Sequence, residues 1–210
     1  MEKNLQLWQK VTKAIFTGVL LYSVANVLYA IVNPIASVVN TASDVSSFVS
    51  TGDVSGGIGA LDIFLYILLV GVLIGYYLFL KGLGDFRPLL ELADANAINQ
   101  VRNGVILGLL GTVAVFIPYA GWIIAAILNI IGFIFMLLGY SALKSSATFP
   151  MLGRNGAGRL FIAMILVLVG AILSIIPLIG GFIAMVLSIV AFFLTLSGWA
   201  SIKNSDPSVV

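Results

Sequence analysis

Long apolar runs constrain the fold of this chain more than any other feature of its sequence. One run follows Ile117-Pro118 and ends at Lys144, and the same order of proline, glycine, apolar stretch and lysine returns 59 positions later. A helix of about 20 apolar residues crosses the hydrocarbon core of a bilayer. Hydrophobic residues make up 61% of the chain and charged residues only 9%, whereas soluble domains carry about 25% charged residues. The sequence therefore predicts an all-α integral membrane protein.

Six apolar segments can be distinguished, and proline marks two of the connections between them. Proline lacks an amide donor and disfavours helix in the residue before it, so Pro118 and Pro177 are expected to end helices and begin tight turns. The apolar segments lie at about 13–33, 60–81, 103–117, 121–143, 159–176 and 180–202. Residues 1–210 then form one transmembrane domain of three consecutive helical hairpins, at about 13–81 (with an outer loop at about 34–58), 103–143 and 159–202.

The basic residues predict which side of the membrane each connection faces. Six spans with a cytoplasmic N-terminus place all ten Lys and Arg residues in, or at the border of, cytoplasmic regions. An excess of Lys and Arg in cytoplasmic loops is the general rule for membrane proteins. We therefore expect both termini in the cytoplasm and the chain in the cell membrane, which is the inner membrane if the source is bacterial. The ten residues are Lys3, Lys10, Lys13, Lys81, Arg87, Arg102, Lys144, Arg154, Arg159 and Lys203.

The N-terminal segment also has features of a signal peptide. Lysines precede an apolar run, and Ala30 is a candidate cleavage site. Signal peptides have apolar cores of about 7–15 residues, and this run is longer. We therefore expect the segment to remain as the first span.

The second and third hairpins are predicted to be copies of one another. Residues 103–146 and 162–205 align without a gap and share 16 identities in 44 positions. A fainter third copy ends the second segment, where Lys81 stands five residues before Phe86 as Lys144 stands five residues before Phe149. A repeat of two spans keeps one orientation, unlike the inverted repeats of many transporters. The informative matches are Pro118/Pro177, Gly111/Gly170, Gly121/Gly180, Gly139/Gly198 and Lys144/Lys203, and Trp199 replaces Tyr140 where both suit a membrane interface.

Small residues form a stripe along the segment at 180–202. They recur at steps of three and four, which places them on one face of a helix. In lipid, helices associate through close backbone approach at small residues rather than through the hydrophobic effect. We expect this small-residue stripe to pack inside the six-helix bundle, with self-association as the alternative, and we expect leucine at Ser188 or Ala191 to overpack it. The stripe comprises Gly181, Ala184, Ser188, Ala191, Thr195 and Gly198.

Polar chemistry is sparse within the apolar segments. No charged residue lies deep in any of them, which counts against an ion-coupled transporter. Asn26 and Asn129 are the most polar groups at depth, and interhelical hydrogen bonds are expected for both, with a substrate contact as the alternative. Cysteine and histidine are absent, and no nucleophile–base or carboxylate pair falls in one plausible site. We therefore predict no metal, no cofactor and no catalytic activity.

Three connecting stretches receive simple interpretations. TGDVSGGIGA at 51–60 lacks the Gly-Lys-Ser/Thr ending of a phosphate loop and is expected to be a lead-in to the second span. Asp44, Asp53 and Asp62 match no cation-ligand spacing and are expected to be solvated. The stretch from Asp85 to Ala93 has the pattern of a short helix on the membrane surface, with partner docking as the alternative.

The leading functional hypothesis is a non-enzymatic structural, accessory or stress-related membrane protein that acts through helix–helix contacts. The alternative is a passive channel or a carrier of a neutral or lipid-like solute. The expected partners are the lipid bilayer and either a second copy or another membrane protein; nucleic acid is not expected.

Overall fold

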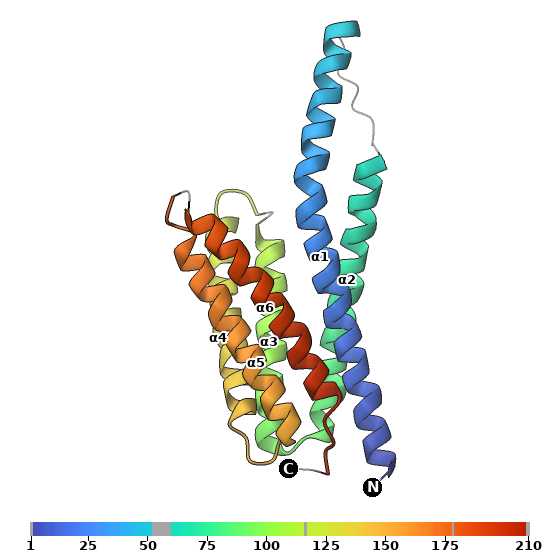
Figure 1. The fold of residues 1–210 in the computed structure, drawn as a ribbon, viewed down its shortest axis with the longest axis vertical. Coiled ribbons are helices and arrows are strands. Elements are labelled where there is room, and N and C mark those ends of the chain that lie inside the picture. The colour runs from blue at the N-terminus through green and yellow to red at the C-terminus, as the bar shows by residue number, and fades with distance from the viewer. Residues whose placement is uncertain (1, 52–59, 116, 178, 209–210) are drawn as a thin grey trace. The chain divides into compact units, whose positions relative to one another are not determined.

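A computed structural model describes residues 2–51, 60–115, 117–177 and 179–208, and these form six α-helices and no strand. The all-helical prediction is confirmed. Five helices (α1, α2, α4, α5 and α6) are long and apolar enough to cross a membrane. The helices, shown in Figure 1, are α1 (Glu2–Thr51), α2 (Ala60–Phe86), α3 (Leu92–Ala114), α4 (Gly121–Lys144), α5 (Met151–Leu173) and α6 (Ile179–Lys203), with a 3-10 turn, η1 (Arg87–Leu89), before α3.

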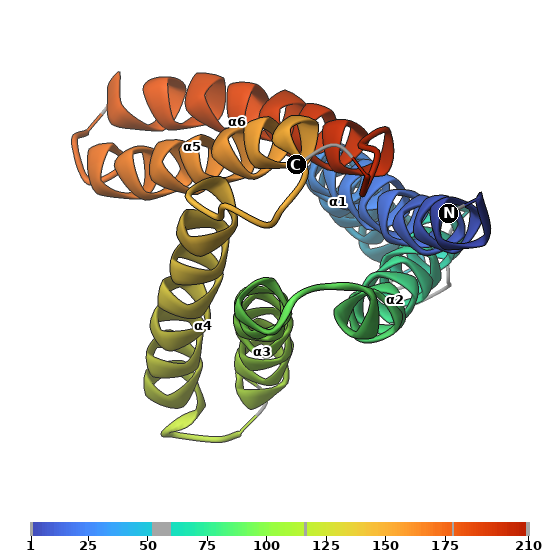
Figure 2. The same cartoon turned by 90° about the horizontal axis from the view of Figure 1, so that it is seen from below.

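The chain forms two compact units. The hairpin unit consists of residues 18–77, and the main unit consists of residues 1–17 and 78–210. In the main unit α3 packs along α4, α5 packs along α6, and α4 also contacts α5, as Figure 2 shows from below. In the hairpin unit the rings of Tyr22 and Tyr76 stack with centroids 4.7 Å apart. The amide of Asn40 donates to Asp62 at 3.0 Å.

Helix α1 is much longer than the sequence predicts. It continues through Pro34 to Thr51, so the expected outer loop at 34–58 is wrong for residues 34–51. Pro34 has no amide hydrogen to donate to the Ala30 carbonyl, but transmembrane helices tolerate such a proline because neighbouring groups and local adjustments satisfy the freed backbone. Hydroxyl side chains in the next turns bond to other carbonyls of the helix. The hydroxyl of Ser37 donates to the Pro34 carbonyl at 2.8 Å, and that of Thr41 donates to the Ser37 carbonyl at 2.8 Å. Residues 52–59, and with them most of TGDVSGGIGA and Asp53, lie outside the described residues.

Helix α3 also begins earlier than predicted. It starts at Leu92 rather than near residue 103, and the expected surface helix from Asp85 to Ala93 does not form as a separate element. Phe86 instead ends α2 and is fully buried, because its ring packs against aromatic neighbours in the main unit. The cytoplasmic connection predicted at 82–102 is therefore only a short turn between two long helices.

The α3–α4 and α5–α6 turns are tight, as the Ile-Pro pairs predict. In the first, the amide of Ile117 donates to the Ala114 carbonyl at 3.0 Å, and that of Ala120 donates to the Pro118 carbonyl at 2.8 Å. Tyr119 has a φ of 65°, a left-handed conformation that is uncommon for a residue with a Cβ. The prolines lie within the turns, since α3 has already ended at Ala114 and α5 at Leu173.

Candidate functional site

Glycines on facing helices bring α3 and α4 into backbone contact. A Cβ added to Gly132 would lie 2.6 Å from the Gly104 carbonyl oxygen, and one added to Gly104 would lie 2.5 Å from the Gly132 carbonyl oxygen. Near the other end of the interface, a Cβ on Gly139 would lie 2.7 Å from the Ala97 carbonyl oxygen. Real Cβ atoms essentially never come within 3.0 Å of such an atom. Close packing of this kind is what holds helices together in lipid.

Helices α5 and α6 meet in the same way. A Cβ on Gly156 would lie 2.5 Å from the Gly198 carbonyl oxygen, and one on Gly198 would lie 2.9 Å from the Gly156 carbonyl oxygen. The contact therefore involves the C-terminal end of the small-residue stripe. The sequence singles out Gly198 for this contact but not Gly156.

The other members of the small-residue stripe are not equivalent to Gly198. Ala191 is buried, and Ala184 and Thr195 are half-buried. Ser188 and Gly181 are exposed, and a Cβ on Gly181 would meet nothing within 4 Å. Close packing is thus concentrated in the half of α6 that leads to Lys203.

The two asparagines singled out by the sequence are both exposed. Asn26 lies on α1 in the hairpin unit. Asn129 lies on α4, where its amide nitrogen is 2.8 Å from the position a Cβ on Gly111 would take. Neither side chain hydrogen-bonds to any described residue, so the interhelical hydrogen bonds expected within the chain do not form. The missing side chain of Gly111 leaves room for the Asn129 amide to lie against α3.

An aromatic cluster fills the end of the main unit where α1 begins. The ring of Trp8 meets Phe86 at 4.7 Å and Phe149 at 6.1 Å between centroids, and Phe86 meets Phe149 at 6.4 Å. All three side chains are at most 2% exposed. The sequence marks Phe86 and Phe149 only as equivalent repeat positions, five residues after Lys81 and Lys144; it gives no signal that they touch.

Trp199 and Tyr140 are buried rather than placed at the surface. Their exposures are 1% and 5%, and their rings meet edge to face at 6.3 Å. Both rings therefore pack inside the main unit, and the prediction that they lie at the depth of a membrane interface stays a prediction. Each follows one of the tightly packed glycines, Gly198 and Gly139, so the close approach of the helices encloses these rings.

The loop between α4 and α5 is fixed by polar contacts. The Ser146 hydroxyl accepts the amides of Thr148 at 3.1 Å and Phe149 at 3.0 Å. The Thr148 hydroxyl donates to the Asp94 carboxylate at 2.8 Å. Arg154 donates to the Ser146 carbonyl at 3.1 Å. These bonds attach the loop to the start of α3, and they orient Asp94, which is only 2% exposed.

A cavity of about 460 Å³ lies beside this loop. Trp8, Glu91, Asp94 and Thr148 line it together with apolar residues of η1 and the loops. The C-terminal segment reaches it through Pro207. Nearby, hydrogen bonds from the side chain and the backbone amide of Ser208 lower the pKa of Asp206. The sequence gives no sign of this cavity, because its lining comes from four separate stretches of chain.

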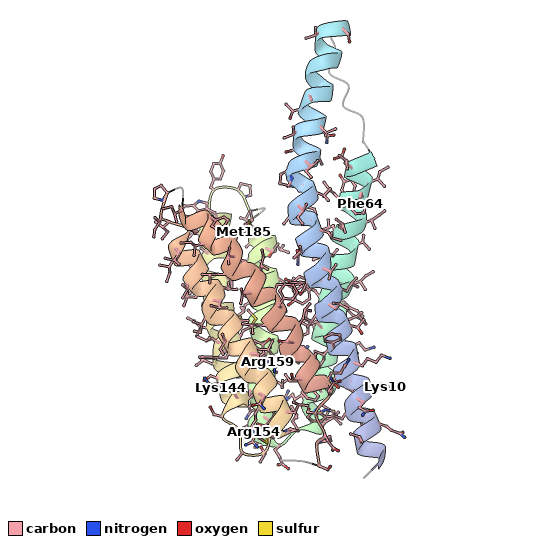
Figure 3. All side chains as sticks on the ribbon, in the orientation of Figure 1. Lys10, Phe64, Lys144, Arg154, Arg159 and Met185 are labelled. Atoms are coloured by element: carbon pink, nitrogen blue, oxygen red, sulfur yellow. The ribbon has the colours of Figure 1, made fainter. Side chains whose placement is uncertain are left out.

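Two lysines at helix ends lie over aromatic rings. The Lys144 ammonium is 3.7 Å from the centroid of Phe161, and the Lys203 ammonium is 4.6 Å from that of Phe16. Arg159 donates to the Ser201 hydroxyl at 3.0 Å. These contacts secure basic side chains at one end of the main unit, where Figure 3 labels Arg159 and Lys144.

No group of three or more Asp and Glu side chains that could hold a metal ion occurs among the described residues. No protein-family model matches the chain, and no curated protein or solved structure is significantly similar to it. The interpretation of the molecule therefore depends on its own contacts.

Proposed function

We propose that this chain is a six-span cell-membrane protein of three repeated helical hairpins, with both termini in the cytoplasm. It acts without catalysis, through contacts with other membrane helices. The functional part of this proposal rests on the exposed amide of Asn129 in the apolar middle of α4, which has no hydrogen-bond partner among the described residues. The repeat and the topology have separate support.

Matching hydrogen bonds in the two tight turns support the repeat. The three bonds of the α3–α4 turn recur 59 positions later with lengths within 0.1 Å, namely Ile117 to Ala114 (3.0 Å) with Ile176 to Leu173 (2.9 Å), Ala120 to Pro118 with Ile179 to Pro177 (both 2.8 Å), and Gly121 to Ile117 with Gly180 to Ile176 (both 3.0 Å). The packing repeats as well. Gly139 faces Ala97 and Val101, and the equivalent Gly198 faces Gly156 and Leu160.

The helices of the first hairpin meet at a glycine contact like that between α3 and α4. The position of this contact suggests another alignment of the third copy than the one based on Lys81. A Cβ on Gly75 would meet the Gly18 carbonyl oxygen and the Tyr22 amide nitrogen. A Cβ on Gly132 would meet the corresponding atoms of Gly104 and Gly108, again four residues apart. The third copy therefore matches best when Gly75 is aligned with Gly132, rather than Lys81 with Lys144.

Packing supports α3 as the sixth span, although its first half carries polar residues, among them Asp94 and Arg102. Gly104 lies against Gly132 in the middle of α4, Ala97 lies against Gly139 near the Lys144 end, and Ala114 lies against Gly121 at the other end. Helix α3 thus follows α4 over its whole length. A neighbour that accompanies a span from end to end occupies the same depth of the bilayer.

The distribution of labelled basic residues supports the proposed topology. Figure 3 shows Lys144 and Arg154 toward one end of the main unit and Met185 toward the other. Basic residues concentrate on the cytoplasmic side of membrane proteins. The end with Lys144 and Arg154 is accordingly assigned to the cytoplasm.

The contact surface is the exposed face of α4 around Asn129. A side-chain amide carries two donors and one acceptor, and leaving such a group without partners in hydrocarbon costs free energy. A second copy supplies a self-complementary partner, since two amides can each donate to the other. Interhelical hydrogen bonds in membranes contribute about 0.6–2 kcal/mol. A homodimer through this face would give the Asn129 amide the partner that the described part of the chain does not supply.

Cysteine crosslinking tests this contact without background, because the chain contains no cysteine. Ala126 is exposed and lies three residues before Asn129, so it shares that face of α4. In native membranes, Ala126→Cys should form a disulfide-linked dimer on mild oxidation. Adding Asn129→Leu should reduce the dimer several-fold, because the amide pair is lost.

The matched control places the cysteine on a different helix. Ile172→Cys on α5 replaces an isoleucine that is 58% exposed, and it should give little dimer in either background. If Ala126→Cys crosslinks equally well with asparagine and leucine at position 129, the amide does not hold the contact. The proposed function would then lose its support.

A further inference from the structure

The cavity beside the α4–α5 loop combines a buried acid with apolar walls. Asp94 and Glu91 contribute carboxylates, and Trp8, Pro150 and Pro207 contribute apolar surface. The cavity measures about 460 Å³, a size within the range of small-molecule sites. It lies outside the face around Asn129, so a ligand bound here is independent of the proposed function.

The charge of the lining favours a cation. Among the described residues that line the cavity there is no lysine or arginine, whereas Glu91 and Asp94 each bring a carboxylate. Helices α3 and α5 begin at the cavity, directly after Glu91 and Pro150. Each helix N-terminus acts as roughly half a positive charge, so two N-termini offset about one of the two carboxylates. The described residues of the lining therefore keep an excess of negative charge.

Asp94 has fewer partners than a buried carboxylate needs. It is 2% exposed and accepts one hydrogen bond, from the neutral Thr148 hydroxyl. A carboxylate can accept about four hydrogen bonds, and a buried charge is costly unless it is paired. Within the described chain, no lysine or arginine forms an ion pair with it. A positive group from outside the chain would supply the missing partner.

The walls of the cavity favour an organic cation over a metal ion. Metal ions need several oxygen or nitrogen ligands, and the described residues contain no cluster of three acidic side chains. An indole face attracts ammonium groups. Trp8 is 2% exposed, and its buried Nε1 has no hydrogen-bond acceptor among the described residues. An oxygen on the bound molecule, beside its ammonium group, would offer that donor an acceptor.

We propose that this cavity binds a small organic ammonium ion. The ammonium group lies at Asp94 and Glu91, and the apolar part lies against Trp8 and the prolines. Free amines and the headgroups of amino phospholipids share this chemistry.

Calorimetric titration in a nonionic detergent tests the proposal, with benzylammonium chloride as the probe and benzyl alcohol as its neutral match. We expect benzylammonium to bind at least tenfold more tightly than the alcohol. Asp94→Asn keeps an acceptor for Thr148 but removes the charge, and it should weaken benzylammonium binding at least tenfold. Asp85→Asn, at an exposed acid outside the cavity lining, should leave binding unchanged.

Thermal unfolding without ligand checks that Asp94→Asn is folded. If Asp94→Asn is not folded, Glu91→Gln, at the exposed edge of the cavity, is measured instead. It should bind benzylammonium several-fold more weakly than the unchanged protein. Equal binding of benzylammonium and benzyl alcohol would overturn the proposal. So would full retention of binding in whichever variant is folded.

Nanodiscs distinguish the two sources of the ammonium group. In each kind of disc, the benzylammonium binding of the Asp94→Asn variant is subtracted from that of the unchanged protein. This removes the signal from benzylammonium that adsorbs to lipid. If benzylammonium binds in phosphatidylglycerol discs but at least tenfold more weakly when phosphatidylethanolamine is included, the lipid headgroup occupies the cavity. Equal affinity in both discs identifies a free amine as the ligand. Absence of specific binding in both discs and in detergent refutes the site.

Discussion

Gly132→Ala offers a sharp test of helix packing in the main unit. The added Cβ would lie 2.6 Å from the Gly104 carbonyl oxygen, and ordinary van der Waals contact begins at 3.4 Å. The obstructing atom belongs to the backbone, so no side-chain rotation can relieve the overlap. Helices α3 and α4 must separate by the difference, about 0.8 Å. The Gly108 amide nitrogen and the Leu107 Cβ, each 3.2 Å from the added Cβ, are also too close to it.

Two effects of opposite sign determine the outcome. Replacing glycine by alanine inside a helix favours the helix by about 1 kcal/mol. Overpacking a filled interface costs about 1–3 kcal/mol. Gly132→Ala experiences both effects. Gly158→Ala in α5 experiences only the first, because a Cβ there meets nothing within 4 Å. The two variants should therefore differ by the overpacking cost, about 1–3 kcal/mol.

Thermal unfolding of the purified protein in detergent measures this difference. For a chain of 150–250 residues, 1 kcal/mol moves the melting temperature by about 2–4 °C, so Gly132→Ala should melt about 2–12 °C below Gly158→Ala. The comparison cancels the helix-propensity term common to both. If the two variants melt at the same temperature, the glycine contact between α3 and α4 is not tight, and the packing argument fails.

The fold and its contacts give three further expected outcomes. A reporter active only in the cytoplasm should work when fused after Lys203 and fail when inserted within residues 52–59; activity at the second site would overturn the proposed topology. Ala191→Leu should lower the melting temperature in detergent because Ala191 is buried, whereas Ser188→Leu should be mild because Ser188 is exposed; equal effects would contradict this division. Trp8→Ala should cost about 3–5 kcal/mol in denaturant unfolding, and a loss below about 1 kcal/mol would show that the aromatic cluster is not a core.

The sequence predicts the helices of this protein where one physical requirement dominates. Apolar runs mark all six helices, although for α3 only its second half, because a segment that must satisfy its own backbone in lipid has no alternative to a helix. The Ile-Pro turns are predicted for an equally direct reason, the missing proline amide. At Pro34 the same reasoning fails. A proline can end a helix or be accommodated within one, and α1 continues through Pro34 to Thr51.

The candidate sites are harder to predict because they depend on tertiary contacts. Gly198 and Gly181 look alike in sequence, yet one meets a backbone carbonyl and the other meets open space. The periodicity of small residues predicts which face of a helix they share. It does not predict along which part of that face a neighbouring helix packs. Asp94 is inconspicuous in the sequence because it stands in a short polar stretch, where acids are common. Only the meeting of Thr148 and Trp8 around one cavity distinguishes it from the others.

The number of spans depends on α3, and charge and packing lead to the same answer. If α3 stayed on one side, only five helices would cross, and the chain ends would lie on opposite sides. Lys144, Arg154 and Lys203 would then face outward while the N-terminal lysines faced the cytoplasm, against the preference of basic loops. Such a helix could not accompany α4 from Gly139 to Gly121, as α3 does. In the proposed topology, an α3 that crosses the membrane places Lys144, Arg154 and Lys203 on the same side as the N-terminal lysines. Arg102 then lies within the span, two residues before Gly104.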